Sequence, residues 1–215
     1  MPDPSRYPGY DVLRKRHTPS WNDKTRQVID ARLAVPREPR FFDAHELATI
    51  TAVADRLVPQ PRNRPPIPVA ALIDDKLHKG QEDGFRHEGM PREREAWQRG
   101  LAALDAEAQA QHGAPFLHLS GPQQDALLKQ MEQGALNGPA WGGMPSQTFF
   151  KQRMAKDIVF AYYAHPTAWS EIGFGGPASP RGYVRLGYDQ RDPWEAAESK
   201  DGDTESALRK NRHVG

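Results

Sequence analysis

The chain has 215 residues, of which 37% are hydrophobic, and a mean hydropathy of −0.79, which is low for one large self-contained core. The net charge is +1 and there is no aromatic-rich basic stripe, so no nucleic-acid partner is predicted. The absence of cysteine excludes disulfides, thiolate nucleophiles and iron–sulfur ligation by this chain, and no apolar run reaches the roughly 18 to 20 residues of a membrane span.

Residues 1–40 are predicted to form an extended, basic N-terminal arm with one short helix. This region holds nine Lys or Arg against five Asp or Glu, and four prolines among its first 20 residues favour extended backbone. Ser20 is the predicted N-cap of the helix, which ends before Pro36. The positive charge of the arm can steer it onto an acidic partner surface.

Residues 41–191 are predicted to form an all-α domain, a small irregular bundle of about five to six helices. Its first helix has the clearest signals, because Asp43 and Glu46 have the spacing of a capping box and the following apolar residues recur at helical spacing. Similar periodicity predicts helices that begin near Pro68, Pro91, Ser120 and Ser146. The apolar faces of these helices place Trp97, Phe149 and Phe150 in the core.

The segment from Trp169 to Tyr188 mixes aromatic residues with glycines and prolines. This composition predicts an ordered loop rather than a regular helix or long strand, with a short extended piece over Gly182–Gly187 at most. Some of its rings are expected to fold back on the last helix, while others contact a partner. Residues 192–215 are polar and are predicted to be disordered unless Trp194 docks.

No catalytic, cofactor-binding or metal-ligating residue is predicted in this chain. The acidic pairs Asp74–Asp75 and Glu82–Asp83 are interpreted as solvated charges, because neighbouring helical residues diverge by about 100° and do not form a shared acid–base site. Gly173–Gly176 does not follow a strand, as a dinucleotide-binding fingerprint must. Four histidines leave a metal-dependent helical enzyme open as an alternative: His78, His87, His112 and His118.

Aromatic residues in the arm, loops and tail are the predicted partner-interface residues. Such rings combine a large apolar surface with a polar tip and are enriched at interfaces. The candidates are Tyr7, Tyr10, Trp21, Trp141, Phe174, Tyr183, Tyr188 and Trp194.

The order of several short motifs resembles one known family. The motifs include Phe42-x-x-x-Glu46-Leu, the run from Ala54 to Pro59, Arg99-Gly-Leu, Tyr162-Tyr-x-x-Pro166 and Pro180-Arg-Gly-Tyr183. Together they resemble the gluconate 2-dehydrogenase subunit 3 family, from about Phe41 to Tyr188.

The resemblance implies a non-catalytic helical small subunit in a hetero-oligomer. Its partner would be a flavoprotein dehydrogenase of the glucose–methanol–choline type, which carries FAD and the catalytic histidine and acts on a sugar or sugar acid. Small subunits of this family support the folding, stability and often the export of the large subunit. The N-terminal arm resembles that of a branch associated with glycoside 3-dehydrogenase systems.

The resemblance also bears on localisation. Many family members carry a twin-arginine signal, whereas this sequence has no recognisable signal, since no apolar stretch follows Arg14-Lys15-Arg16. A cytoplasmic location is therefore expected, and periplasmic delivery by co-export with a signal-bearing partner is the alternative. For function, the leading hypothesis is an accessory subunit, and a general protein-binding adaptor remains a further alternative beside the metal-dependent enzyme.

Overall fold

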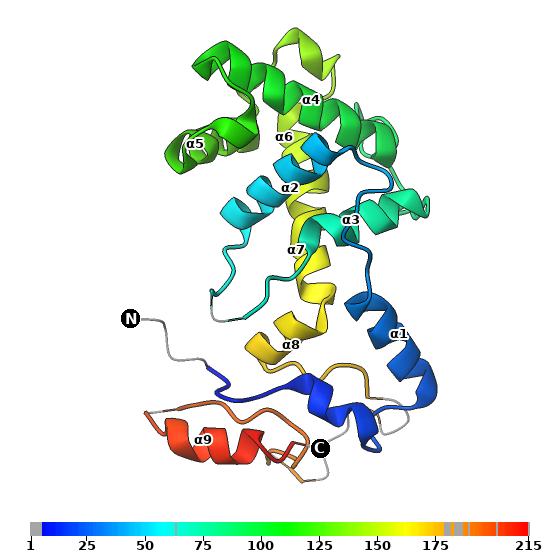
Figure 1. The fold of residues 1–215 in the computed structure, drawn as a ribbon, viewed down its shortest axis with the longest axis vertical. Helices are drawn as coiled ribbons and strands as arrows, with labels where there is room; N and C mark the ends of the chain where they lie inside the picture. The colour runs from blue at the N-terminus through cyan, green and yellow to red at the C-terminus, as the bar shows by residue number, and fades with distance from the viewer. Residues whose placement is uncertain are drawn as a thin grey trace. The chain divides into compact units, whose positions relative to one another are not determined.

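The computed structural model describes residues 6–62, 64–178, 182, 187, 188, 190–200 and 202–214. These residues form α-helices, with short 3-10 and π segments and no β-strand among them, which confirms the predicted all-α fold (Figure 1). The chain divides into two compact units: unit 1 combines residues 1–34 with 163–215, and unit 2 contains residues 35–162.

Unit 2 contains most of the helices that the sequence predicts. Two of these helices begin at local capping signals, because the capping boxes of Asp43 with Glu46 and of Ser120 with Gln123 are both formed. Helix α2 packs against α3, α4 and α5. The helices of unit 2 are α2 (Ala44–Leu57), α3 (Val69–His78), α4 (Glu93–His112), α5 (Gly121–Gln133), α6 (Ser146–Phe149) and α7 (Ala155–Ala164), the last of which extends past the unit boundary.

The core of unit 2 is built around Trp97, Phe149 and Phe150, as predicted from their helical faces. The rings of Trp97 and Phe149 meet edge to face, with centroids 5.8 Å apart, and Trp141 lies 6.0 Å from Phe149 on another side. A Cβ atom at Gly100 would lie 2.1 Å from Cζ of Phe149. Gly100 therefore allows helix α4 to approach this ring directly.

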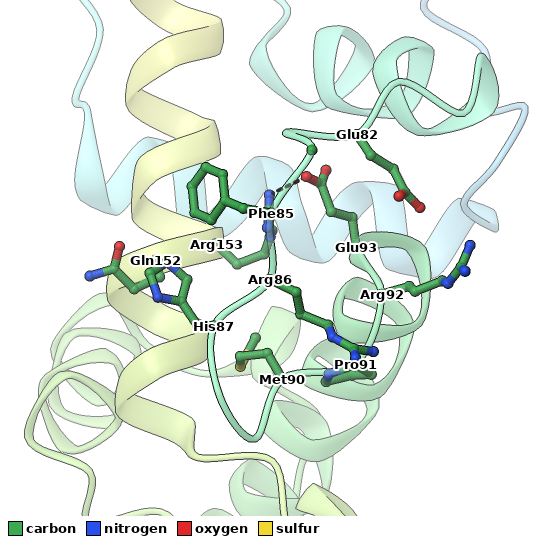
Figure 2. Close-up of a pocket in the computed structure, with 11 residues that line it drawn as sticks. Glu82, Phe85, Arg86, His87, Met90, Pro91, Arg92, Glu93, Gln152 and Arg153 are labelled. Carbon is green, nitrogen blue, oxygen red and sulfur yellow. Dashed lines mark ion pairs between the residues drawn. The ribbon is translucent and has the colours of Figure 1, made fainter.

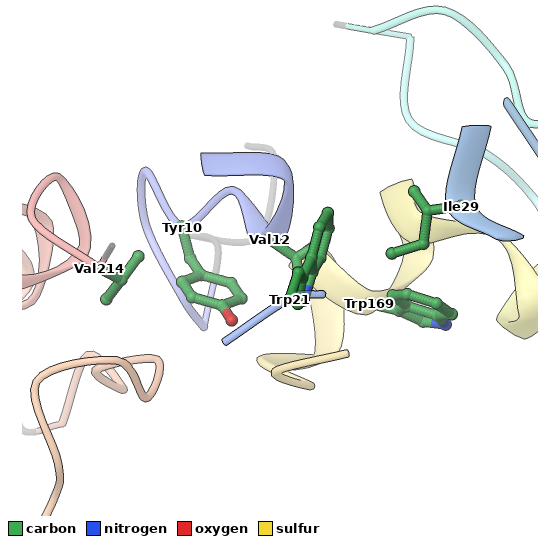
Figure 3. Close-up of a cluster of buried hydrophobic side chains, with 6 residues drawn as sticks. All are labelled: Tyr10, Val12, Trp21, Ile29, Trp169 and Val214. Atoms are coloured by element: carbon green, nitrogen blue, oxygen red, sulfur yellow. The ribbon is translucent and has the colours of Figure 1, made fainter. Parts of the chain in front are cut away.

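Unit 1 joins the two ends of the chain. Its helical segments are a 3-10 turn (Val12–His17), α1 (Asp23–Leu33), α8 (Pro166–Ile172) and α9 (Thr204–Asn211). The core of this unit contains two tryptophans and residues from both ends of the chain (Figure 3): Tyr10, Val12, Trp21, Ile29, Trp169 and Val214.

Helix α9 forms in the stretch that was expected to be disordered. The side chain of Asp203 caps the helix by accepting from Ser206 N. At its end, buried Asn211 donates Nδ2 to the carbonyls of Pro8 and Ala197, both at 2.9 Å, and accepts from Ala197 N at 2.7 Å. These tertiary hydrogen bonds order a polar helix, so the two units divide the chain differently from the predicted arm, domain and tail.

Two local predictions in unit 1 differ from the structure. Asn22, not Ser20, caps α1, because its side chain accepts from Thr25 N at 2.9 Å. The segment that begins at Trp169 is helical up to Ile172, and Gly173 ends that helix in the left-handed conformation with φ 69°. The proposed extended piece over Gly182–Gly187 falls mostly outside the described residues.

An ion pair between α2 and α4 makes stability depend on pH. Nε2 of His45 lies 2.6 Å from Oδ2 of Asp105, and this hydrogen bond raises the pKa of His45 above its ordinary 6.5. The contribution of the ion pair to the free energy of unfolding is complete below about pH 6.5. It is lost as pH rises through the raised pKa of His45 in the folded state. Because the His45 side chain is half exposed, we expect this ion pair to add less than about 0.5 kcal/mol to the free energy of unfolding.

Urea unfolding at several pH values measures this contribution. The free energy of unfolding of the wild type should fall slightly relative to His45→Gln as pH rises from 5.5 to 8.5, since the variant lacks the titrating ring. Parallel pH profiles for the two proteins would contradict the assignment.

Candidate functional site

A network of six charged side chains lies where α3, α4 and α7 meet the loop of residues 81–92. At its centre is Arg153, whose side chain is only 6% exposed. Its Nη1 lies 2.9 Å from Glu93 Oε1 and 3.1 Å from Asp83 Oδ2. Three cations face three carboxylates in this charge network: Lys76, Arg153 and Lys156 with Asp83, Glu93 and Asp157.

Burial and ion pairing act in opposite directions on the carboxylates of the charge network. Burial alone would raise the pKa of Asp83, but hydrogen bonds from Lys156 and Lys76 and the charge of Arg153 outweigh it, so the pKa of Asp83 is lowered. Burial raises the pKa of Asp157 despite the charge of Lys76 and a 2.9 Å hydrogen bond from Trp97 Nε1. Asp83 is therefore held as a carboxylate by its cations.

The charge network fixes the 81–92 loop on helix α7. Asp83 N donates to Glu93 Oε1 at 2.7 Å, and the carboxylate of Asp83 receives Lys156 Nζ at 2.8 Å. A π-helical segment (Phe150–Met154) lies between α6 and α7 and carries Arg153 toward this loop. Such segments insert an extra residue into a helix and occur often at functional sites.

The interpretation of both acidic pairs as solvated charges is wrong for one member of each pair. Asp74 is buried and accepts from the backbone N–H groups of Arg40, Phe41 and Phe42, each at 2.9 Å. Asp83 belongs to the charge network. The sequence around each residue does not predict either role, because the donors are distant along the chain. They lie more than 30 residues from Asp74 and up to 73 residues from Asp83.

The loop and α7 together present an exposed aromatic patch. Phe85 and Phe160 are 56% and 63% exposed, and Val159 beside Phe160 is also exposed. Lys156 Nζ lies 4.9 Å from the Phe85 ring centroid and 5.7 Å from that of Phe160, so its ammonium group is in cation–π range of both rings. We call these four residues, Phe85, Lys156, Val159 and Phe160, the aromatic patch.

A cavity of about 270 Å³ adjoins the aromatic patch and shares Phe85 with it. Its wall includes Arg86, His87 and Met90 from the loop, together with Glu93 and Arg153 of the charge network (Figure 2). The Phe85 ring meets the ring of His87 edge to face at 5.5 Å. Phe85 therefore belongs both to the exposed patch and to the wall of a cavity that contains charged groups.

The eight predicted interface residues do not form one surface. Tyr10 and Trp21 belong to the core of unit 1, and Trp141 is buried in unit 2, where its Nε1 donates to Glu107 at 3.1 Å. Tyr7 and Trp194 are partly buried, Phe174 and Tyr188 are exposed, and Tyr183 lies outside the described residues. Only part of the predicted set is therefore available on the surface.

The residues of the aromatic patch were not predicted from the sequence. Phe160 lies off the apolar stripe that includes Met154 and Ile158, and that displacement is the signal that could have identified it. Phe85 follows Gly84 in a polar loop, where a lone aromatic residue has no helical face to occupy.

The four histidines of the metal hypothesis are dispersed. His78, His112 and His118 are exposed, and His87 packs against Phe85. Throughout the described ranges, no group of three or more His, Asp or Glu side chains is placed to hold a metal ion. Within the same ranges, every helix is too short or too polar to cross a membrane.

Comparison with known proteins gives one match. A protein-family model described as gluconate 2-dehydrogenase subunit 3 matches residues 44–176, a range that contains the charge network and the aromatic patch. No curated protein and no solved structure matches the chain.

Proposed function

Because the matched range covers more than half of the sequence, the chain belongs to the gluconate 2-dehydrogenase subunit 3 family, and we propose that it is a non-catalytic small subunit that binds and stabilises an FAD-dependent dehydrogenase. The family name describes a subunit of a dehydrogenase complex. In our proposal the large subunit is a flavoprotein of the glucose–methanol–choline type that holds FAD and the catalytic residues. Its substrate is a sugar or glycoside.

The aromatic patch is the observation that carries this proposal. Exposed phenylalanines on a surface held rigid by ion pairs are suited to be anchors, since little side-chain or loop entropy is lost when they bind. Lys156 between the rings adds a cation that an acidic partner residue can approach. The patch lies inside the family-matched range.

Binding to the folded large subunit would stabilise it by mass action. A partner that binds only the folded form adds RT ln(1 + [L]/Kd) to its free energy of unfolding, which is about 2.7 kcal/mol at 100 times Kd. The small subunit therefore needs no catalytic group to raise the yield of active, flavin-loaded enzyme.

Replacing Phe160 by serine should weaken binding of the large subunit at least about 30-fold, or about 2 kcal/mol, because an anchor ring is lost from the centre of the interface. Leu33→Ser, at another exposed apolar helical position, is the matched control and should bind like the wild type. Co-expression with the large subunit, followed by affinity purification and measurement of Kd and bound flavin, tests both variants.

Two results would contradict the proposal at different levels. A large subunit that is soluble, flavin-loaded and fully active without the small chain would rule out the accessory role. A folded Phe160→Ser variant that binds as tightly as the wild type would rule out the aromatic patch as the interface while leaving the accessory role intact.

A further inference from the structure

Unit 1 contains a second cavity, of about 550 Å³, on the side of the Gly173–Gly176 segment. The rings of Tyr7, Phe174 and Trp194 line it, and so do the cationic residues Lys15 and Arg191. Most of these residues lie outside the family-matched range, so the cavity is a feature of this chain's own ends.

Lys15 is an almost completely buried lysine at the wall of this cavity. The residue is 1% exposed, and its Nζ donates to the carbonyl of Gly175 at 3.3 Å and lies 5.8 Å from the Tyr10 ring centroid. A Cβ atom at residue 175 would lie 3.0 Å from Nζ. Glycine at this position therefore makes room for the ammonium group beside the cavity.

Arg191 brings a second cation to the cavity wall. Its Nη2 donates to Pro193 O at 3.4 Å, whereas its buried Nε has no hydrogen-bond partner among the described residues. Burial lowers the pKa of Arg191, and the charge of Glu195 only partly opposes this effect. Arg191 therefore adds a partly desolvated positive charge to the cavity wall, and such a charge favours an anion in the cavity.

The carboxylates at the cavity wall are already engaged. Glu195 accepts from Asp192 N at 2.9 Å, and Glu198 pairs with Nε of Arg6 at 2.5 Å. Lys200 and Lys210 also line the cavity, so cations outnumber carboxylates among the described lining residues. The excess of positive charge favours an anionic ligand group, and the three rings favour an apolar body attached to that group.

We propose that this cavity binds a carboxylate group carried on an aromatic or other apolar body, with Arg191 and Lys15 as its charged partners. Guanidinium and carboxylate groups match in charge and planar shape, which makes arginine the preferred residue for carboxylate recognition. The carboxylate belongs either to a free small molecule or to a residue of the large subunit, and the two sources share this chemistry.

Binding of N-acetyl-phenylalanine to the full chain tests the site, with N-acetyl-phenylalaninamide as the uncharged control. We expect calorimetry to show that the carboxylate form binds at least tenfold more tightly than the amide. Arg191→Gln should abolish this difference, whereas Arg209→Gln, which changes an exposed arginine on α9, should preserve it. Equal binding of the two compounds to the wild type, or binding of neither, would overturn the proposal.

Two further measurements guard against simpler explanations. Phe174→Ala removes an exposed ring from the cavity wall and should weaken the binding of both compounds by the same factor. This variant still tests the site if Arg191→Gln fails to fold. Inorganic phosphate should not displace N-acetyl-phenylalanine at equal concentration. Displacement by phosphate would show a general anion site and would also overturn the proposal.

The complex with the large subunit distinguishes the two sources. If the partner supplies the carboxylate, Arg191→Gln and saturating N-acetyl-phenylalanine should each weaken the complex at least tenfold. If the ligand is free, the complex should form normally and still bind N-acetyl-phenylalanine. The calorimetric test on the chain alone does not depend on the dehydrogenase partner, so its failure is separate from failure of the proposed function.

Discussion

Replacing Arg153 by leucine is expected to lower the free energy of unfolding by about 3–5 kcal/mol, the range for breaking a buried ion pair from one side. The guanidinium contacts three carboxylates, and two of these, Glu93 and Asp157, are themselves almost completely buried. Without Arg153, Lys76 is the remaining cation of the charge network for both. Equilibrium unfolding in urea measures the loss.

Lys129→Leu is the matched control for this substitution. Lys129 pairs with Glu132 at 2.7 Å on the exposed face of α5, where solvent screens the ion pair, so its loss should change the free energy of unfolding little. A loss below about 1 kcal/mol for Arg153→Leu would show that solvent compensates the buried carboxylates. Because the same network anchors the loop of Phe85, a folded Arg153 variant should also bind the large subunit less tightly than the wild type.

Replacing Trp21 by alanine should destabilise unit 1 by about 3–5 kcal/mol, as expected for a large ring removed from a packed core. Trp21 is 2% exposed and shares the core of unit 1 with Val12, Ile29 and Trp169. The main loss should appear as faster amide hydrogen exchange in α1 and the 3-10 turn, with protection retained in α4.

Two control substitutions test whether packing is the cause. Nε1 of Trp21 has no hydrogen-bond partner among the described residues, so Trp21→Phe removes only ring volume. It should lower the free energy of unfolding less than half as much as Trp21→Ala. Leu33→Ala removes an exposed side chain from α1 and should lower the free energy of unfolding by less than about 1 kcal/mol. Unchanged exchange in α1 after Trp21→Ala would show that the N-terminal segment is not held by this core.

The sequence by itself determined that unit 2 is helical and where several of its helices begin or end, although it did not predict the π-helical segment between α6 and α7. Asp43 with Glu46, Ser120 with Gln123, and the glycine that follows α4 act within one helical turn, so their effect is encoded locally. The core positions of Trp97 and Phe149 also followed from periodicity, because one face of an amphipathic helix must be buried. The order of short motifs identified the family.

Only the tertiary structure decided the burial of several other polar and aromatic residues. Asp83 became part of the charge network through Lys76, Arg153 and Lys156, which come from separate helical segments. Trp21 entered a core and Phe160 stayed outside one, although both are large aromatic residues. Burial outside a helix's apolar stripe depends on which distant segments pack together, and spacing within one helix does not say which segments those are.

The structure of the C-terminal region also depends on contacts that the local sequence does not predict. A polar composition predicted disorder, yet Asn211 forms buried hydrogen bonds with Pro8 and Ala197 that hold helix α9 in unit 1. The cavity of unit 1 likewise needs the folded chain, since Lys15 and Arg191, which both line it, are 176 positions apart in the sequence. Local propensity described the helices, and long-range packing created both candidate binding sites.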